Sequence, residues 1–223
     1  MTGWTGTTEH VTDEDVALEW RRRAERPGLA RVMRASQPDT LNAGVTEQTR
    51  RIVADQLTIV GERLGRRPRR ALEIGCGIGR LTPTIAESAD HVHAIDMTPA
   101  MLAQARAACA GLSTVDFSCE RIDRMRVPGE RYDAAVCVWV LMHVLDETQL
   151  ATACRTIAAS TRYLTLIEYE RANVPVSRWS RLRALDDYLA LMPGAEVVDR
   201  RVVDYGGDTS FAALIRFDGE PSR

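Results

Sequence analysis

Lysine is absent from this 223-residue chain, and all 29 of its basic residues are arginines. The arginines do not outnumber the acids, since the formal net charge at pH 7 is −2. A protein that binds nucleic acid without a specific pocket needs an excess of basic side chains on one face to neutralise phosphates. The charge balance therefore excludes a generally basic nucleic-acid binder, and we expect no nucleic-acid partner.

Metal-binding cysteine motifs and long hydrophobic runs are also missing. The five cysteines form no Cys-x-x-Cys pair, so we expect reduced, mostly buried thiols. No apolar run reaches the roughly 20 residues that cross a bilayer, and no apolar segment follows a basic amino terminus. These absences predict a cytoplasmic protein without a membrane partner. Because 45% of its residues are hydrophobic, the chain can bury the core of one sizeable domain.

Short apolar runs alternate with helical stretches through the middle of the chain. This βαβ order predicts a parallel sheet covered by helices on both faces. Two further runs on either side of a Gly-Gly pair predict a terminal antiparallel hairpin. The expected strands are 70–74, 91–95, 115–118, 132–138, 163–167, 196–205 and 211–217, and the expected later helices are 80–88, 99–110, 146–159 and 181–191.

Two helices are predicted before the first strand. Residues 13–26 begin with acids and end with arginines, as the helix dipole favours. Residues 46–64 carry apolar side chains at helical spacing. We expect residues 1–66 to form an N-terminal helical cap segment on a domain of residues 67–218, with a frayed tail from Asp218.

Three closely spaced glycines follow the first predicted strand. Gly75, Gly77 and Gly79 lie between that strand and a helix, where backbone N–H groups can approach a ligand. The dinucleotide-binding motif needs a further glycine three residues after the second one, but Arg80 stands there. Glu73 lies beside the loop, and its carboxylate would repel a phosphate and attract a cation. The loop therefore favours a ligand other than a pyrophosphate.

An acid also ends the second predicted strand. Asp96 lies about twenty residues beyond the first glycine, the position from which a carboxylate accepts hydrogen bonds from ribose hydroxyls. Asp96 thus provides a site for a ribose, while Glu73 disfavours a phosphate and attracts a cation. Together they predict a nucleoside that carries an amine or a sulfonium.

Three segments together resemble the motifs of the class I S-adenosylmethionine-dependent methyltransferases. They are "ALEIGCGIGRLT" from Ala71, "HAIDMTPAMLAQAR" from His93 and "RYDAAVCVWVLMHV" from Arg131, and the likeness extends to Glu168. The resemblance implies a doubly wound, mostly parallel Rossmann-like sheet with a terminal antiparallel hairpin. It also implies S-adenosylmethionine as cofactor and S-adenosylhomocysteine as product.

The resemblance assigns a set of cofactor-binding positions. Glu73 would lie near the amino group of the methionyl part, Asp96 would hold the ribose, and two methionines would lie against the adenine. Where the family often has Gly-Asp-Ala after the third strand, this chain has Cys119-Glu120-Arg121. The full set is Glu73, Gly75, Cys76, Gly77, Gly79, Asp96, Met97, Met101, Glu120, Arg121 and Val138.

Other missing motifs limit the type of methyl transfer. No Asn/Asp-Pro-Pro-aromatic motif follows the fourth strand, and no Pro-Cys pair occurs, so amino-methylating and cytosine-C5 DNA enzymes are excluded. Magnesium-binding carboxylates are also missing at Val138 and Trp139, so we expect no catalytic metal. In-line transfer to an oxygen or nitrogen atom remains, in which the protein aligns the acceptor and removes its proton.

The acceptor is expected to be a small molecule, in specialised (natural-product) metabolism. His143 and Glu168 are the competing candidates for the catalytic base, and the substrate-facing candidates are Trp20, Trp139, Met142, Tyr169 and Trp179. An alternative acceptor is a peptide α-amine, because "VWVLMHV" also resembles the Trp-Val-x-x-His segment of protein N-terminal methyltransferases; their Asn after the fifth strand is missing. An NAD-dependent oxidoreductase and a non-catalytic nucleoside-binding protein are less favoured. The sequence leaves a monomer and a homodimer open.

Overall fold

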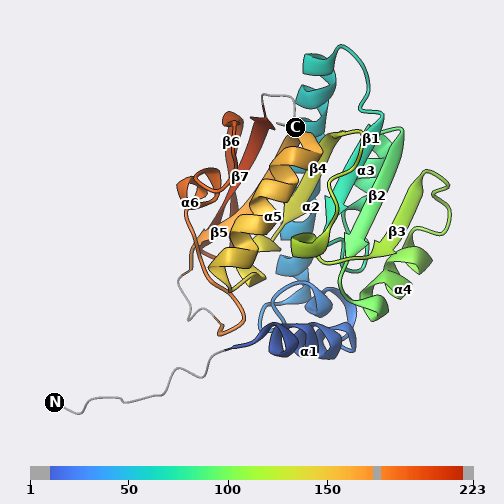
Figure 1. Cartoon of the computed structure of the whole chain (residues 1–223). Helices are drawn as coiled ribbons and strands as arrows, with labels where there is room; N and C mark the ends of the chain where they lie inside the picture. The colour runs from blue at the N-terminus through green and yellow to red at the C-terminus, as the bar shows by residue number, and fades with distance from the viewer. Residues whose placement is uncertain (1–10, 173–176, 218–223) are drawn as a thin grey trace.

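Seven strands form one sheet with helices on both faces in the computed structural model, which describes residues 11–172 and 177–217 (Figure 1). The strands are β1 (Arg70–Ile74), β2 (His91–Asp96), β3 (Val115–Cys119), β4 (Tyr132–Val138), β5 (Thr161–Arg171), β6 (Ala195–Tyr205) and β7 (Asp208–Phe217). The helices are α1 (Asp13–Ala24), α2 (Asp39–Leu64), α3 (Thr82–Ser88), α4 (Pro99–Ala108), α5 (Glu147–Ser160) and α6 (Leu185–Leu189). Three 3₁₀ turns are η1 (Gly28–Arg31), η2 (Ile122–Arg124) and η3 (Leu141–His143).

The strand order is β3-β2-β1-β4-β5-β7-β6. The first five strands pair in parallel, and β7 runs antiparallel to both β5 and β6. The predicted mostly parallel sheet with a terminal antiparallel hairpin is therefore confirmed. The direction of winding reverses between β1 and β4, and in sheets of this kind ligands bind outside the carboxyl ends of the strands at that point.

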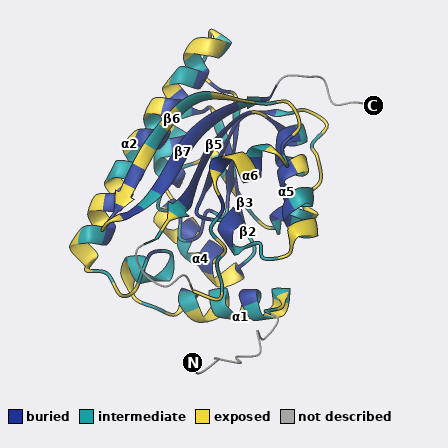
Figure 2. Ribbon diagram, turned by 90° about the vertical axis from the view of Figure 1, so that its left-hand side faces the viewer, coloured by how far each residue is buried: buried dark blue, intermediate teal, exposed yellow. Residues whose placement is uncertain are grey.

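Both faces of the central strands are buried, whereas most residues of the edge strands β3 and β6 are exposed or half-buried. All seven residues of β4 are buried, including Asp133, as the otherwise apolar sequence predicts for a central parallel strand. One apolar cluster joins α2 and α3 to one face, and another joins α5 and α6 to the opposite face. Figure 2 shows the buried strands between helices whose outer surfaces are exposed.

The N-terminal helices differ in their positions. α1 lies across the carboxyl ends of the parallel strands (Figure 1). α2 begins at Asp39, earlier than expected, and buries Val53, Leu57 and Val60 against the sheet. It is therefore one of the helices that cover the sheet, and only α1 and η1 lie where we expected a cap. The domain division at residue 66 stays a prediction, and the tail from Asp218 lies outside the described residues.

Two further elements differ from the expected ranges. The helix expected at 181–191 is reduced to the single turn of α6. Strand β5 extends to Arg171, because β7 pairs with it from Tyr163 to Arg171, beyond Ile167, the last residue that pairs with β4. Glu168 and Tyr169 consequently lie within the strand, opposite Phe211 and Ser210, and not in a loop after it.

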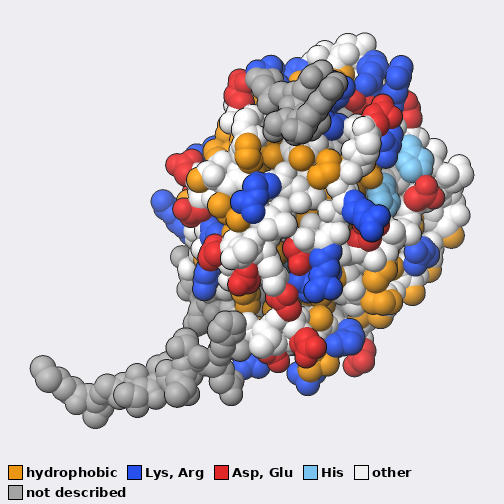
Figure 3. Space-filling model, in the orientation of Figure 1, with side chains coloured by type: hydrophobic (Ala, Val, Ile, Leu, Met, Phe, Trp, Pro, Cys, Tyr) orange, Lys and Arg blue, Asp and Glu red, His pale blue; other side chains and the backbone are white. Residues whose placement is uncertain are grey.

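The surface charges are mixed. On the face shown in Figure 3, arginines and acids are interspersed, without a large area of one sign. Within residues 11–172 and 177–217, no helix has both the length and the apolar character needed to cross a membrane.

Candidate functional site

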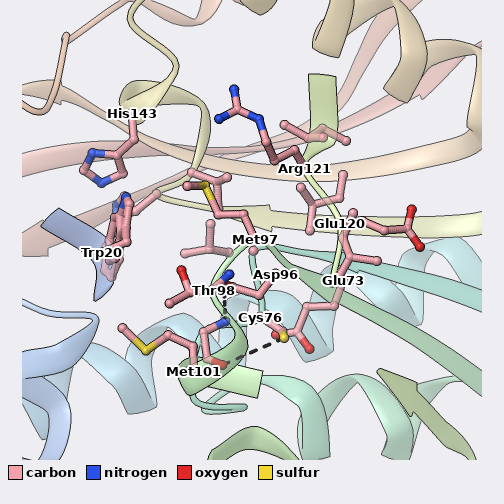
Figure 4. Close-up of a pocket in the computed structure, with 18 of the residues that line it drawn as sticks. Trp20, Glu73, Cys76, Asp96, Met97, Thr98, Met101, Glu120, Arg121 and His143 are labelled. Atoms are coloured by element: carbon pink, nitrogen blue, oxygen red, sulfur yellow. Dashed lines mark hydrogen bonds between the residues drawn. The ribbon is translucent and has the colours of Figure 1, made fainter. Parts of the chain in front are cut away.

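A cavity opens at the carboxyl ends of β1 to β4, underneath α1 (Figure 4). It holds about 1140 Å³ of space when its open mouth is included. The cavity lies at the winding reversal between β1 and β4, where sheets of this kind bind their ligands.

The glycine loop lines this cavity through two of its three glycines. Gly75 and Gly77 have φ angles of 67° and 56°, a region that favours glycine. A Cβ atom would come within 2.4 Å of Val140 at Gly75 and within 2.8 Å of Val32 at Gly77. The loop therefore requires glycine for both its conformation and its close packing.

Gly79 has a different role from the one expected. It does not line the cavity, and a Cβ atom there would meet the backbone of Ala105 in α4 at 3.2 Å. Gly79 thus lets α4 approach the loop. Contact between Gly79 and the cofactor, which the resemblance implied, is not supported by this position.

Glu73 lies under the loop and is only 3% exposed. Its Oε2 accepts a hydrogen bond of 2.6 Å from the hydroxyl of Thr82. Burial raises the pKa of this carboxyl to about 7, although the Thr82 hydroxyl and the nearby Arg80 act in the opposite direction. Cys76, beside it in the cavity wall, is also buried, and burial raises the pKa of its thiol.

Asp96 joins the end of β2 to the glycine loop. Its Oδ2 accepts from the Gly77 N–H at 2.9 Å, and its Oδ1 accepts from the Thr98 N–H at 2.8 Å. Both oxygens keep a second lone pair for ribose hydroxyls. Met97 and Met101 line the same wall, as expected for residues against an adenine (Figure 4).

The wall at the end of β3 contains the expected Glu120 and Arg121. The Arg121 guanidinium pairs at 3.0 Å with Asp13 of α1, and Gln149 of α5 donates to the same carboxylate at 2.7 Å. These contacts attach α1 to the body of the domain. Asp13 and Gln149 also line the cavity, and sequence analysis missed them because their places there depend on how α1 and α5 pack on the rest of the domain.

Trp139 and Val138 line the cavity at the end of β4. Trp139 has a φ of 55°, which is uncommon for a residue other than glycine. Its indole donates to the Ser210 hydroxyl at 3.0 Å and stacks on Tyr169 and Tyr205 at 5.5 and 5.9 Å. The ring is therefore fixed by β5, β6 and β7.

His143 follows in the η3 turn and also lines the cavity. Its Nδ1 lies 2.7 Å from the carbonyl oxygen of Trp179, so Nδ1 carries the proton and donates it. Trp20 of α1 packs edge-on against the imidazole at 4.9 Å (Figure 4). Burial lowers the pKa of His143 to about 4, so the ring is neutral at pH 7 and its Nε2 is an acceptor.

Glu168 lies outside the cavity wall and is fully buried. Its carboxylate accepts hydrogen bonds from the backbone N–H groups of Val140, Leu141 and Met142 at 2.9, 2.7 and 3.4 Å. Burial raises its pKa to about 8, and the three N–H groups oppose that increase. Glu168 therefore holds the turn that carries His143 and, in this structure, does not face the cavity.

Three of the expected substrate residues are also outside the cavity wall. The side chains of Met142 and Tyr169 are buried in the apolar cluster beneath α2. Trp179 contributes its carbonyl group to His143 and does not line the cavity. Of the five candidates, only Trp20 and Trp139 face the cavity.

Among residues 11–172 and 177–217, no group of three or more His, Cys, Asp or Glu side chains could hold a metal ion.

Comparison with known proteins shows that the middle of the chain is similar to methyltransferases. Residues 71–163 match the methyltransferase-domain family. The ubiquinone biosynthesis O-methyltransferase of Hahella chejuensis is 33% identical over 107 residues, which cover 46% of this chain and 44% of that protein. The chain thus spans about half the length of the curated relatives it matches.

Solved structures show the same fold. The N-methyltransferase NodS from Bradyrhizobium japonicum WM9, in complex with S-adenosylhomocysteine, superposes with a TM-score of 0.70 and 18% identity, covering 91% of this chain and 99% of that one. Magnesium protoporphyrin IX methyltransferase from Synechocystis, with bound S-adenosylmethionine, gives 0.65 and 16%, covering 89% and 90%. With the seven-stranded sheet and the glycine loop, these matches show that the chain has the fold of the class I S-adenosylmethionine-dependent methyltransferases and that its residues 71–163 are similar to the methyltransferase-domain family.

Proposed function

We propose that this protein transfers a methyl group from S-adenosylmethionine to an oxygen or nitrogen atom of a small molecule. The observation that carries the proposal is Asp96, whose carboxylate faces the cavity while it holds the glycine loop through the Gly77 N–H. This geometry provides a ribose acceptor beside a loop that a methionyl chain can approach closely.

The residues present fit S-adenosylmethionine. Its adenosine part would lie against Met97 and Met101, with Glu120 near the base. Its amino group would lie near Glu73. When bound, the cofactor supplies a methyl group that its sulfonium has already activated. The chain's own residues then have to orient the acceptor, exclude water and accept a proton.

His143 is the base that we propose, because it lines the cavity while Glu168 does not. The Trp179 carbonyl fixes the tautomer that leaves Nε2 as the acceptor. A ring with a pKa near 4 is a weak base before the reaction. An attacking hydroxyl becomes strongly acidic as its oxygen gains the methyl group, so a weak base at Nε2 can take its proton at that stage.

An acceptor hydroxyl is favoured by the names of the curated relatives, which are O-methyltransferases. The cavity beneath α1 suits a small molecule, and we keep specialised metabolism as its proposed source. A peptide α-amine is the second candidate acceptor. We also propose that the protein is cytoplasmic and that it is a monomer or a homodimer.

Methyl transfer can be tested directly. Purified protein would be incubated with methyl-labelled S-adenosylmethionine and fractionated metabolites, with peptides bearing a free α-amine in a parallel series. The proposal predicts label in a small-molecule fraction. Label found only in the peptides would show that the acceptor is a peptide α-amine and not a small molecule. Binding of S-adenosylmethionine without transfer to any fraction would favour a non-catalytic nucleoside-binding protein.

A further inference from the structure

The η3 turn, which carries His143, has few hydrogen bonds of its own. It spans only three residues, and its internal bonds run from the His143 N–H to the Val140 carbonyl oxygen and from the Val144 N–H to the Leu141 carbonyl oxygen, both at 3.0 Å. A 3₁₀ turn also has poorer hydrogen-bond geometry than an α-helix. The orientation of the His143 imidazole therefore depends on the groups that bind the turn from outside.

The carbonyl groups of the turn are bound by residues 177–183, a segment that we call the strap. The backbone N–H of Arg181 donates to the Met142 carbonyl oxygen at 2.8 Å. The Nη2 atom of Arg183 donates to the carbonyl oxygen of Val144, the residue that ends the turn, at 3.2 Å. The strap thus binds the turn at two carbonyl groups, once through its backbone and once through a side chain.

The strap also holds the imidazole of His143. The Nδ1 atom donates to the Trp179 carbonyl oxygen at 2.7 Å, and the Ser180 hydroxyl lies 3.2 Å from the same nitrogen. A neutral imidazole with its proton on Nδ1 keeps Nε2 as its acceptor. The position of the strap therefore decides which ring nitrogen can receive a proton.

Arg183 is the buried side chain that joins the strap to the body of the domain. It is only 8% exposed, and its Nη2 also donates to Oε1 of Glu147, at the start of α5, at 3.0 Å. The guanidinium is near Glu168 as well, because it opposes the increase that burial causes in the pKa of that carboxyl. A buried guanidinium is costly without partners, so these groups fix its place. Arg183 therefore connects the strap both to the Val144 carbonyl and to the surroundings of Glu168, which accepts the N–H groups of the same turn.

We propose that Arg183 is a positioning residue for the catalytic base: it fastens the strap to the η3 turn, so that the Trp179 carbonyl holds His143 in the form that leaves Nε2 as the acceptor. Arg183 itself lies outside the cavity wall, so it acts through His143. This inference rests on the proposed function, because it requires His143 to be the base. Without Arg183 the strap would lose its bond to Val144, and the imidazole would exchange its bond to Trp179 for bonds to water.

Nitrogen-15 NMR of the histidine side chains tests this directly, with the signals of His143 identified by their absence from His143→Ala. In the wild type we expect a neutral ring with its proton on Nδ1 at pH 7, because burial lowers the pKa of His143 to about 4. Arg183→Gln should move the midpoint of the titration upward by at least about one pH unit and populate the form with the proton on Nε2, since the ring becomes hydrated. Arg183→Lys should shift the midpoint less, because it keeps the charge without the planar fork. Arg23 of α1, the charged side chain that also lowers this pKa, is unchanged in these variants.

Methyl transfer to the fraction that accepts label from the wild type provides a second readout. Arg183→Gln should lower kcat about tenfold to a hundredfold, as expected for a displaced catalytic group. Its affinity for S-adenosylhomocysteine in calorimetry should stay within about twofold of the wild type, because Arg183 lies outside the cavity wall. A role in stability alone would leave both kcat and the imidazole signals of the folded variant unchanged.

Arg181→Gln is the matched control. The Arg181 guanidinium binds the same Glu147, but the side chain is 56% exposed, and its contact with the turn is made by the backbone, which the substitution keeps. This variant should show the wild-type tautomer and titration midpoint of His143. Thermal unfolding would show which variants are folded, and Arg183→Lys is the second test should Arg183→Gln fail to fold.

Wild-type imidazole signals in a folded Arg183→Gln would overturn the inference, and so would an equal shift in Arg181→Gln. An unchanged kcat in Arg183→Gln despite displaced signals would overturn it too. If Arg183→Gln did not fold, wild-type signals in Arg183→Lys would overturn it. A wild-type protein that transferred label to no fraction would contradict the proposed function, whereas the signals of the imidazole, which need no acceptor, would still test the role of Arg183.

Discussion

The two sides of the cavity are built in different ways. The cofactor side consists of the cavity residues after β1, β2 and β3, and the acceptor side consists of those after β4 together with the cavity residues of α1. On the cofactor side, the Asp96 carboxylate is held by two backbone N–H groups. On the acceptor side, the aromatic ring of Trp139 stacks on side chains from β5 and β6, and the imidazole of His143 packs against α1.

The two sides of the cavity therefore differ in whether local sequence motifs can describe them. The cofactor side is assembled from consecutive strand ends within a short stretch of chain, so local motifs describe it. The acceptor side needs segments that are far apart in the sequence, and its shape depends on how α1 and the hairpin pack. We infer that the cofactor side sets the reaction type and the acceptor side sets the substrate.

The largest effect is expected from Gly75→Ala, which distorts the cofactor side. The added methyl group would lie 2.4 Å from Val140, in a backbone conformation that alanine disfavours. We expect the free energy of unfolding to fall by about 2 to 4 kcal/mol and S-adenosylhomocysteine binding to be lost. Denaturant unfolding and calorimetry would measure both. Gly129→Ala is the control, because its added methyl group would meet nothing within 4 Å; equal behaviour of the two variants would refute the close packing.

On the acceptor side, His143→Ala should lower kcat by about a hundredfold, the contribution of a positioned base. Affinity for S-adenosylhomocysteine should remain nearly unchanged, since the imidazole lies on the other side of the cavity. Steady-state kinetics and calorimetry would separate the two quantities. His91→Ala, at the distant entrance of β2, should leave both unchanged.

The same histidine predicts a pH dependence. Its pKa is about 4 in the folded protein and 6.5 in the unfolded chain. Between these two pH values the unfolded chain binds a proton at His143 that the folded protein does not bind. The contribution of the neutral imidazole to stability is therefore lost as the pH falls from 6.5 towards 4. Denaturant unfolding at several pH values should show less loss of stability across this window in His143→Ala than in the wild type. An identical loss in both proteins would contradict the lowered pKa.

A smaller effect is expected from Glu168→Gln, which tests the support of the acceptor side. The amide nitrogen of glutamine would face backbone N–H groups that now donate to a carboxylate, and about 1 to 3 kcal/mol of stability should be lost. We expect kcat to fall about tenfold through displacement of the η3 turn, less than in His143→Ala. If instead kcat collapsed in Glu168→Gln and barely changed in His143→Ala, Glu168 would be the base and His143 a structural residue.

The smallest effect is expected from metal removal. Val138 and Trp139 occupy the strand end where a catalytic magnesium ion would need carboxylates, so methyl transfer should be unchanged in EDTA. If turnover were lost in EDTA and restored by added magnesium, the acceptor side would contain metal ligands that were overlooked.

The features that could be predicted from the sequence are also divided between the cofactor side and the acceptor side. The bounds of β4 were predicted correctly because six of its seven residues are apolar, which is typical of a central strand. Asp96 and Gly75 were placed in the cavity wall because their motifs are local. Glu168 and Tyr169 were misplaced because pairing with β7 extends β5, and that pairing joins residues about forty positions apart, beyond the range of local sequence patterns.

Packing between elements accounts for the remaining differences. Gly79 faces α4 and not the cavity, which depends on the angle at which that helix docks. α2 covers the sheet because its apolar residues pack on β4, β5 and β6, whereas its spacing alone was compatible with a cap. Neither contact leaves a signature in the spacing of residues along the chain.

Calorimetric titration of the wild-type protein and Asp96→Ala with S-adenosylhomocysteine, and with NAD as the competing ligand, tests the central claim most directly. We expect the wild type to bind S-adenosylhomocysteine and not NAD. We also expect Asp96→Ala to bind S-adenosylhomocysteine about tenfold to a hundredfold more weakly, because two ribose hydroxyls lose their acceptor. Equal affinity of the two proteins for S-adenosylhomocysteine, or tight binding of NAD by the wild type, would contradict the assignment of the cofactor site.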